Sequence, residues 1–169
     1  NINKINGISY FKNNKIINTD KKVMNIKLDD LPFLDYKELQ GHLPPRFELR
    51  SSRGCIGKCR FCSLPNYFDK IKVHSINYII NQINHLKNFY DFNYLHFIDE
   101  MFLCNQKHAK ELSIKIMKHF PDLKWGAMLR SDLIKDELIS TMSKSGFNNT
   151  VLGIESPVPK VLKYLDKTK

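Results

Sequence analysis

From residue 47 onward, short apolar runs alternate with segments of helical spacing, and this alternation limits the fold more than any other feature. The apolar runs begin near residues 47, 94, 124 and 149, and a helical pattern follows each of them. Strands that alternate with helices favour a parallel sheet. Right-handed crossovers would curl such units into a barrel or part of one. We therefore predict an α/β fold, a truncated, partial (β/α) barrel with about four βα units.

Periodicity and capping residues predict the bounds of the elements. Strands are expected from Phe47 and over 93–98, 124–129 and 149–154, and helices over 75–89, 106–119, 135–144 and 157–166. Gly146 is expected to cap the third helix. Upstream, residues 7–20 alternate around Asn13 and Asn14, which is typical of a small β-hairpin. We expect residues 1–45 to form a lead-in or linker and residues 46–169 to form the core.

Composition excludes several classes of protein. Hydrophobic residues make up 42% and charged residues 26%, which is typical of a globular chain. No apolar run approaches the roughly 20 residues of a membrane span, and no export signal is present, so a cytoplasmic location is expected. The chain begins with Asn1, and we expect it to be a piece of a longer protein.

The net charge of +10 comes mainly from scattered lysines, 22 of them beside 5 arginines. Surfaces that bind phosphate usually cluster their basic residues and use arginine for bidentate contacts. Nucleic-acid binding is therefore not expected as the main role. A metal-stabilised basic module that contacts RNA stays as the alternative to an enzyme.

Three cysteines lie within eight residues. Cys55, Cys59 and Cys62 follow the spacing Cys-x3-Cys-x2-Cys, while Cys104 is separate. Without an export signal, a metal or redox site is favoured over disulfides. A 4Fe–4S cluster normally takes four cysteines, so three would leave one iron open. Zinc, with Cys104 or His74 as a fourth ligand, is one alternative, and cysteines without a metal are the other.

Charged residues also follow the later strands. Asp99 and Glu100 come after the second strand, Arg130 and Asp132 after the third, and Glu155 with Ser156 after the fourth. In (β/α) barrels the chemistry lies at the carboxyl ends of the strands. We therefore expect these residues and the cysteine loop to share one site.

The cysteine motif, with Phe61 directly before its third cysteine, resembles the signature of the radical S-adenosylmethionine superfamily. The segments FIDEMF (97–102), WGAMLRSDL (125–133) and the stretch 145–167 resemble the subgroup that often carries an N-terminal cobalamin-binding domain. Residues 26–36 resemble the linker that joins such a domain to the barrel. The resemblance covers roughly residues 25–169.

The resemblance implies an activity. Cys55, Cys59 and Cys62 would hold a 4Fe–4S cluster, and its open iron would chelate S-adenosylmethionine. One electron from the cluster would cleave the cofactor to methionine and a 5′-deoxyadenosyl radical, which abstracts hydrogen from a small-molecule substrate. The reaction would be methyl transfer or ring formation, with flavodoxin or ferredoxin as electron donor. Cobalamin would be held by a domain outside this chain.

The resemblance also implies contacts with S-adenosylmethionine. Phe61, Asp99, Glu100, Arg130 and Glu155 are the expected cofactor-binding residues. The family often has Gly-Gly-Glu at the end of the second strand, where this chain has Ile98-Asp99-Glu100, so the role falls to either carboxylate. Glu155 is expected at the ribose hydroxyls or the amino group. Arg130 either clamps a carboxylate or pairs with Asp132.

Overall fold

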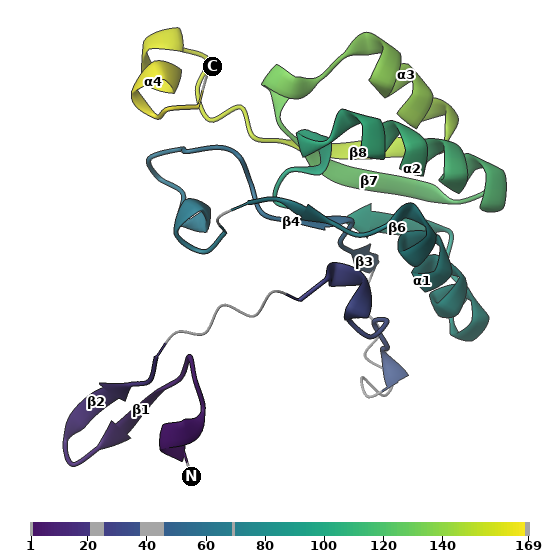
Figure 1. The fold of residues 1–169 in the computed structure, drawn as a ribbon. Helices are drawn as coiled ribbons and strands as arrows, with labels where there is room; N and C mark the ends of the chain where they lie inside the picture. The colour runs from purple at the N-terminus through teal and green to yellow at the C-terminus, as the bar shows by residue number, and fades with distance from the viewer. Residues whose placement is uncertain (1, 21–25, 38–45, 69, 168–169) are drawn as a thin grey trace.

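A four-stranded parallel sheet organises the chain, in the order β3–β6–β7–β8 (Figure 1). The computed structural model describes residues 2–20, 26–37, 46–68 and 70–167. The strands are β3 (Phe47–Leu49), β6 (Tyr94–Phe97), β7 (Lys124–Leu129) and β8 (Phe147–Leu152), and the connecting helices are α1 (Ile76–Phe89), α2 (Gln106–His119) and α3 (Asp136–Lys144). The predicted α/β fold with parallel strands is confirmed.

Smaller elements flank this sheet. The strands β1 (Ser9–Lys12) and β2 (Lys15–Asn18) form the predicted antiparallel hairpin. Asn13 and Asn14 turn it with φ angles of 49° and 61°, a region that asparagine tolerates. A second antiparallel pair, β4 (Ser52–Arg53) and β5 (Lys72–Val73), and the short helix α4 (Pro159–Tyr164) complete the fold. The predicted domain boundary at residue 45 lies outside the described residues.

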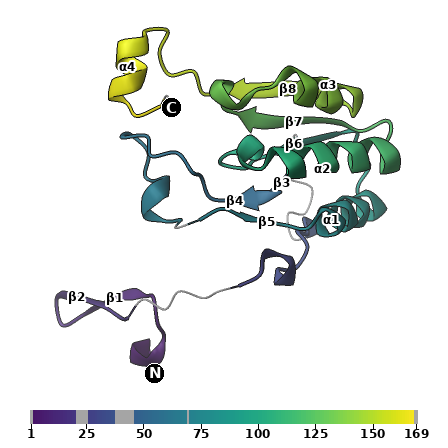
Figure 2. The same cartoon turned by 45° about the horizontal axis from the view of Figure 1, so that its top comes forward.

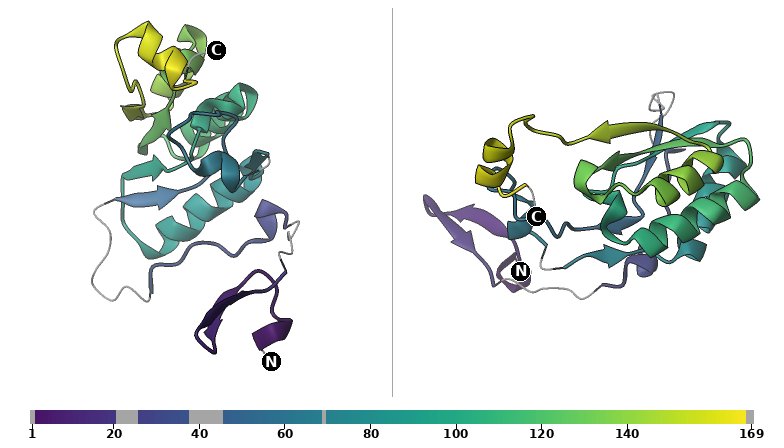
Figure 3. Two further views of the ribbon diagram at one scale, coloured as in Figure 1. Left: turned by 90° about the vertical axis from the view of Figure 1, so that its left-hand side faces the viewer. Right: turned by 90° about the horizontal axis from the view of Figure 1, so that it is seen from above.

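The two faces of the sheet differ. Alternate residues such as Leu95, Phe97 and Trp125 are fully buried and belong to the core that the three long helices share. These helices lie along the same face of the sheet (Figure 3). On the opposite face, Met128 and Val151 are 45% and 50% exposed. Helices on one face only are the arrangement of a (β/α) barrel.

Capping residues explain most helix boundaries. The Ser75 hydroxyl accepts a hydrogen bond from the Tyr78 amide at 3.1 Å, so α1 begins one residue later than predicted. Gly146, with φ of 94°, ends α3 as expected and leads directly into β8. The fourth strand therefore begins and ends two residues before the predicted range. None of the described helices has the length and apolar character that a membrane crossing requires.

A buried carboxylate joins the first two strands. Asp99, which follows β6, is 0% exposed and accepts hydrogen bonds from Ser51 and Ser52. The Ser51 amide donates at 3.2 Å and the Ser52 hydroxyl at 2.6 Å, and the Ser52 amide donates as well. Burial raises the pKa of Asp99, and these hydrogen bonds oppose the rise. Because the serines lie just beyond β3, this carboxylate fixes the path by which the chain leaves the sheet.

Asp29 fastens the upstream segment to the start of α1. Its carboxylate accepts a hydrogen bond from the Ser75 amide at 3.0 Å and lies 3.1 Å from Nδ1 of the buried His74. Tyr78 stacks on His74 with ring centroids 4.2 Å apart and donates a hydrogen bond to the Leu31 carbonyl. Burial lowers the pKa of His74, against the opposing effect of Asp29.

Replacing Asp99 should destabilise the fold. Asp99→Ala leaves the buried Ser51 and Ser52 donors without their acceptor, and we expect the free energy of unfolding to fall by about 3 kcal/mol. Urea denaturation followed by circular dichroism measures the loss. Asp122→Ala, at an exposed position before β7, is the matched control. Equal denaturation midpoints for the two variants would contradict this role of Asp99.

Stability should also fall with acid through His74. The native pKa of His74 lies below its ordinary value, so the unfolded chain binds the proton first as the pH drops below about 6.5. The His74 contribution is therefore present above that pH and is lost as the pH falls. We expect His74→Gln to flatten the dependence of unfolding free energy on pH below about 6.5, and His119→Gln, at an exposed position, is the control. Parallel curves for His74→Gln and the parent chain would show that His74 has no such effect.

Candidate functional site

The segments that follow the parallel strands lie together at the carboxyl ends of these strands (Figure 2). Glu100 accepts a hydrogen bond from the Gly54 amide at 3.1 Å, which links the end of β6 to the cysteine loop. Arg130, after β7, reaches the same loop through its Nη1, 3.8 Å from the Cys59 Sγ. Glu155, after β8, pairs with Lys167 at 3.0 Å. The structure thus brings all four predicted groups into one contiguous region.

The cysteine loop presents three half-buried thiols, none in a disulfide. The Gly57 amide donates to the Cys55 Sγ at 3.3 Å, and the Cys62 amide donates to the Cys59 carbonyl at 3.0 Å. A Cβ at Gly57 would lie 3.3 Å from the Cys55 Sγ and 3.6 Å from the Cys59 Sγ. Glycine therefore keeps the space between two thiols clear. Burial raises the pKa of Cys55, and the amide of Gly57 opposes that rise.

The thiols are the type of ligand that iron–sulfur clusters take. Within the described ranges, no group of three or more His, Cys, Asp and Glu side chains is arranged closely enough to hold one metal ion. Of the two candidates for a fourth zinc ligand, His74 is engaged elsewhere, since its Nδ1 lies 3.1 Å from the Asp29 carboxylate. Three thiols on one loop, with an amide already donating to sulfur, match the ligands and hydrogen bonds of iron–sulfur proteins.

The two carboxylates after β6 support the base of the loop. Asp99 is enclosed by the serines that follow β3, whereas Glu100 pairs with Arg50 and accepts from Gly54. Gly54 has φ of 102°, and a Cβ there would lie 2.9 Å from the Lys70 carbonyl oxygen, so only glycine fits. Both carboxylates that the sequence offered for cofactor binding therefore hold protein groups in this structure.

Arg130 has several partners. Its Nε and Nη2 bind both carboxylate oxygens of Asp132, at 2.8 and 2.7 Å. Nη2 also donates to the Lys167 carbonyl at 2.6 Å. The hydrogen bond with Asp132 raises the pKa of Arg130. The predicted pairing with Asp132 is thus present, and it occurs together with the contact to Cys59.

Phe61 is part of the cysteine loop, and Glu155 lies beside it. Glu155 adopts φ of 64°, which residues with a Cβ rarely do, and such strain concentrates at functional sites. Its carboxylate faces the Lys167 ammonium group, which in turn lies 5.8 Å from the centre of the Phe61 ring. Phe61 itself is 55% exposed.

Sequence reasoning missed several contacts of the site. From the sequence, no role was assigned to Lys167 or to the serines after β3. For Asp99 a signal existed, because it shares the alternation of the buried Leu95 and Phe97. Glu100 is offset by one residue from this series, so its side chain is expected on the opposite face of the sheet. That pattern favours a buried Asp99 and a more accessible Glu100.

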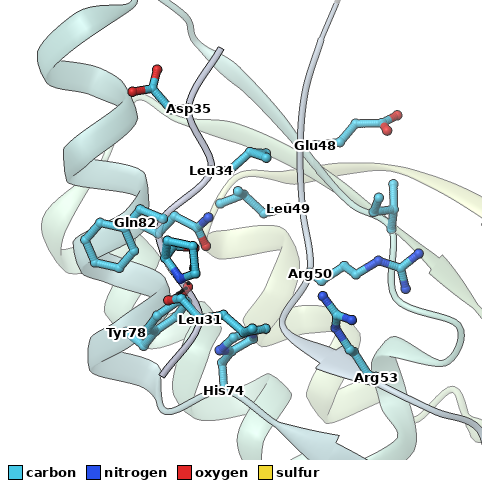
Figure 4. A pocket seen from close by; sticks show the side chains of 13 residues that line it. Leu31, Leu34, Asp35, Glu48, Leu49, Arg50, Arg53, His74, Tyr78 and Gln82 are labelled. Carbon is cyan, nitrogen blue, oxygen red and sulfur yellow. Dashed lines mark hydrogen bonds between the residues drawn. The ribbon is translucent and has the colours of Figure 1, made fainter. Parts of the chain in front are cut away.

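Two cavities border this region. The smaller, about 150 Å³, adjoins the cysteine loop and is lined by Gly57, Lys58, Met101 and Arg130 among others. The larger, about 450 Å³, lies at the edge of β3, with Arg50, Arg53 and His74 at one end and Asp35 and Glu48 at the other (Figure 4). The smaller cavity is the one next to the thiols.

Comparison with known proteins identifies the family. The sequence profile of the radical SAM superfamily matches residues 49–169. An uncharacterized methyltransferase, PH0819, of Pyrococcus horikoshii is 28% identical over 95% of this chain and 36% of its own length. A cytidylyl-2-hydroxyethylphosphonate methyltransferase of Streptomyces wedmorensis is 30% identical over 71% of this chain and 23% of its own. The chain thus spans little more than a third, at most, of the curated relatives it matches.

Solved structures agree on the fold. The radical S-adenosylmethionine methyltransferase TsrM of Kitasatospora setae, solved with cobalamin and a [4Fe-4S] cluster, superposes with a TM-score of 0.65 at 16% identity, over 73% of this chain and 25% of that one. A second TsrM structure, with tryptophan and a SAM analog, gives 0.64 at 16% identity, over 73% and 24%. The family profile, which covers most of the chain including all three motif cysteines, shows that this protein belongs to the radical SAM superfamily.

Proposed function

We propose that this chain is the part of a radical S-adenosylmethionine enzyme that holds a 4Fe–4S cluster on Cys55, Cys59 and Cys62. The observation that carries the proposal is the loop itself, with three unpaired, half-buried thiols at the carboxyl edge of a parallel sheet. Family membership favours this enzyme over the basic RNA-binding module. When bound, the cluster supplies one electron that cleaves S-adenosylmethionine to methionine and a 5′-deoxyadenosyl radical.

The protein's own residues hold and shape the site. The Gly57 amide and the Arg130 guanidinium donate toward sulfur, and Gly54 and Glu100 fix the base of the loop. We assign Glu155 to the hydroxyl or amino groups of S-adenosylmethionine, because a carboxylate accepts hydrogen bonds on both oxygens. That contact requires Glu155, whose side chain is 35% exposed, to give up its ion pair with Lys167.

The remaining candidates take roles near the cofactor. Glu100 is better placed than Asp99 to contact it, since Asp99 is fully enclosed. Phe61, exposed within the loop, offers an aromatic face to the adenine ring. Arg130 already has three protein partners, so we assign it to holding the cysteine loop and not to binding S-adenosylmethionine.

Methyl transfer is the reaction we propose for the whole protein. The two curated relatives and TsrM are named as methyltransferases. TsrM was solved with cobalamin, and a cobalamin domain outside this chain is part of the proposal. A low-potential electron donor such as flavodoxin or ferredoxin is also part of it. The need for reduced thiols and for such a donor favours a cytoplasmic location.

The cysteines provide the direct test. After anaerobic reconstitution, Cys55→Ala, Cys59→Ala and Cys62→Ala should each lose most of the bound iron, because two thiolates cannot hold the cluster. Dithionite with S-adenosylmethionine should release 5′-deoxyadenosine from the parent chain and from none of these three variants. Cys104→Ala is the matched control and should behave as the parent. Stoichiometric zinc in a colourless parent protein would overturn the proposal.

Glu155 should govern affinity for S-adenosylmethionine. Glu155→Gln keeps the shape but removes the charge, and we expect the dissociation constant to rise about tenfold, as for the loss of one charge-assisted hydrogen bond. Isothermal titration of the reconstituted chain measures it. Glu137→Gln, in an exposed ion pair on α3, is the control. A dissociation constant for Glu155→Gln equal to that of the control would remove Glu155 from the binding site.

A further inference from the structure

The guanidinium of Arg130 links three segments that are distant in the sequence. It joins the end of β7, through Asp132, to Cys59 in the cysteine loop and to the carbonyl of Lys167 near the end of the described chain. The Arg130 side chain is only 13% exposed. A charged group so enclosed, with a hydrogen-bond partner on each of its three nitrogens, is held in a fixed orientation.

We propose that Arg130 is a positioning residue, which holds the cysteine loop in its working shape and stabilises the reduced cluster through its hydrogen bond to Cys59. This inference rests on the proposed function and extends it. Asp132 orients the guanidinium by a bidentate pair, so that Nη1 is left to point at the Cys59 sulfur.

Gly57 leaves space in the cysteine loop for this guanidinium. A Cβ at Gly57 would lie 2.9 Å from Nη1 of Arg130, closer than a side chain can pack. The same Cβ would also lie close to the sulfurs of Cys55 and Cys59. Glycine at this position therefore serves both the thiols and the arginine, and the smaller cavity is lined by Gly57 and Arg130 together.

The end of α4 and the segment that follows it also contact the cysteine loop. The Arg60 amide donates to the Leu165 carbonyl at 3.0 Å, and the Arg60 guanidinium lies 5.2 Å from the centre of the Tyr164 ring. Because Arg130 binds the Lys167 carbonyl, this segment and the cysteine loop are fastened to the same side chain. Loss of Arg130 would free both.

Charge explains why arginine suits this position. Three thiolates and a reduced cluster concentrate negative charge, and hydrogen bonds to the sulfurs raise the reduction potential of iron–sulfur clusters. A guanidinium stays protonated at every accessible pH and forms two directed contacts at once. Lysine keeps the charge but cannot bind Asp132 and the sulfur in the same forked geometry.

The first test uses the chain without a cluster. Trypsin cleavage after Lys58 and Arg60, followed by mass spectrometry, reports how well the loop is held. We expect Arg130→Gln to speed cleavage about tenfold, as for the loss of a charge-assisted hydrogen bond, and Arg130→Lys to restore little of the protection. Arg46→Gln, which breaks an exposed ion pair at the other end of β3, should match the parent. Circular dichroism confirms that each variant is folded.

The second test measures the cluster itself. Potentiometric titration monitored by electron paramagnetic resonance should give a more negative midpoint for Arg130→Gln, a smaller shift for Arg130→Lys and none for Arg46→Gln. Unchanged loop cleavage and an unchanged midpoint in Arg130→Gln would overturn the role of Arg130 and leave the proposed function intact. If the cysteine variants showed instead that no cluster forms, the cleavage rates would still decide whether Arg130 positions the loop.

Discussion

The hydrogen bonds between the Asp99 carboxylate and the two serines after β3 determine where the rest of the site can form. They enclose a carboxylate that would otherwise be costly to bury, because every partner is a donor. They also tie the exit of the first strand to the exit of the second. The first motif cysteine, Cys55, lies only three residues beyond Ser52. The hydrogen bonds to Asp99 therefore also fix where the cysteine loop begins.

From that base, the loop is held by groups contributed by each later strand. Glu100 supports the Gly54 amide, Arg130 approaches Cys59, and the segment that contains Lys167 follows β8. The order of these contacts follows the order of the strands in the sheet, because parallel strands deliver their carboxyl ends to one edge.

The alternation was sufficient to predict the sheet, its helices and the edge at which the polar residues gather. Apolar periodicity is a local property, so it locates α1 and β7 within a residue or two. The partners of the site residues could not be predicted in the same way. Arg130 and Lys167 are 37 residues apart, and their contact depends on how α4 returns toward the loop. Which of Asp99 and Glu100 is enclosed depended on strand alternation, a signal that the motif resemblance obscured.

The backbone at Glu155 has a consequence for how this sequence can vary. A left-handed conformation disfavours a residue with a Cβ by about 1–2 kcal/mol, and glycine would relieve that strain while removing the carboxylate. Folding stability and the proposed contact with S-adenosylmethionine therefore favour different residues at this one position. Glycine at this position would gain stability and lose the proposed contact, so a single substitution separates the two effects.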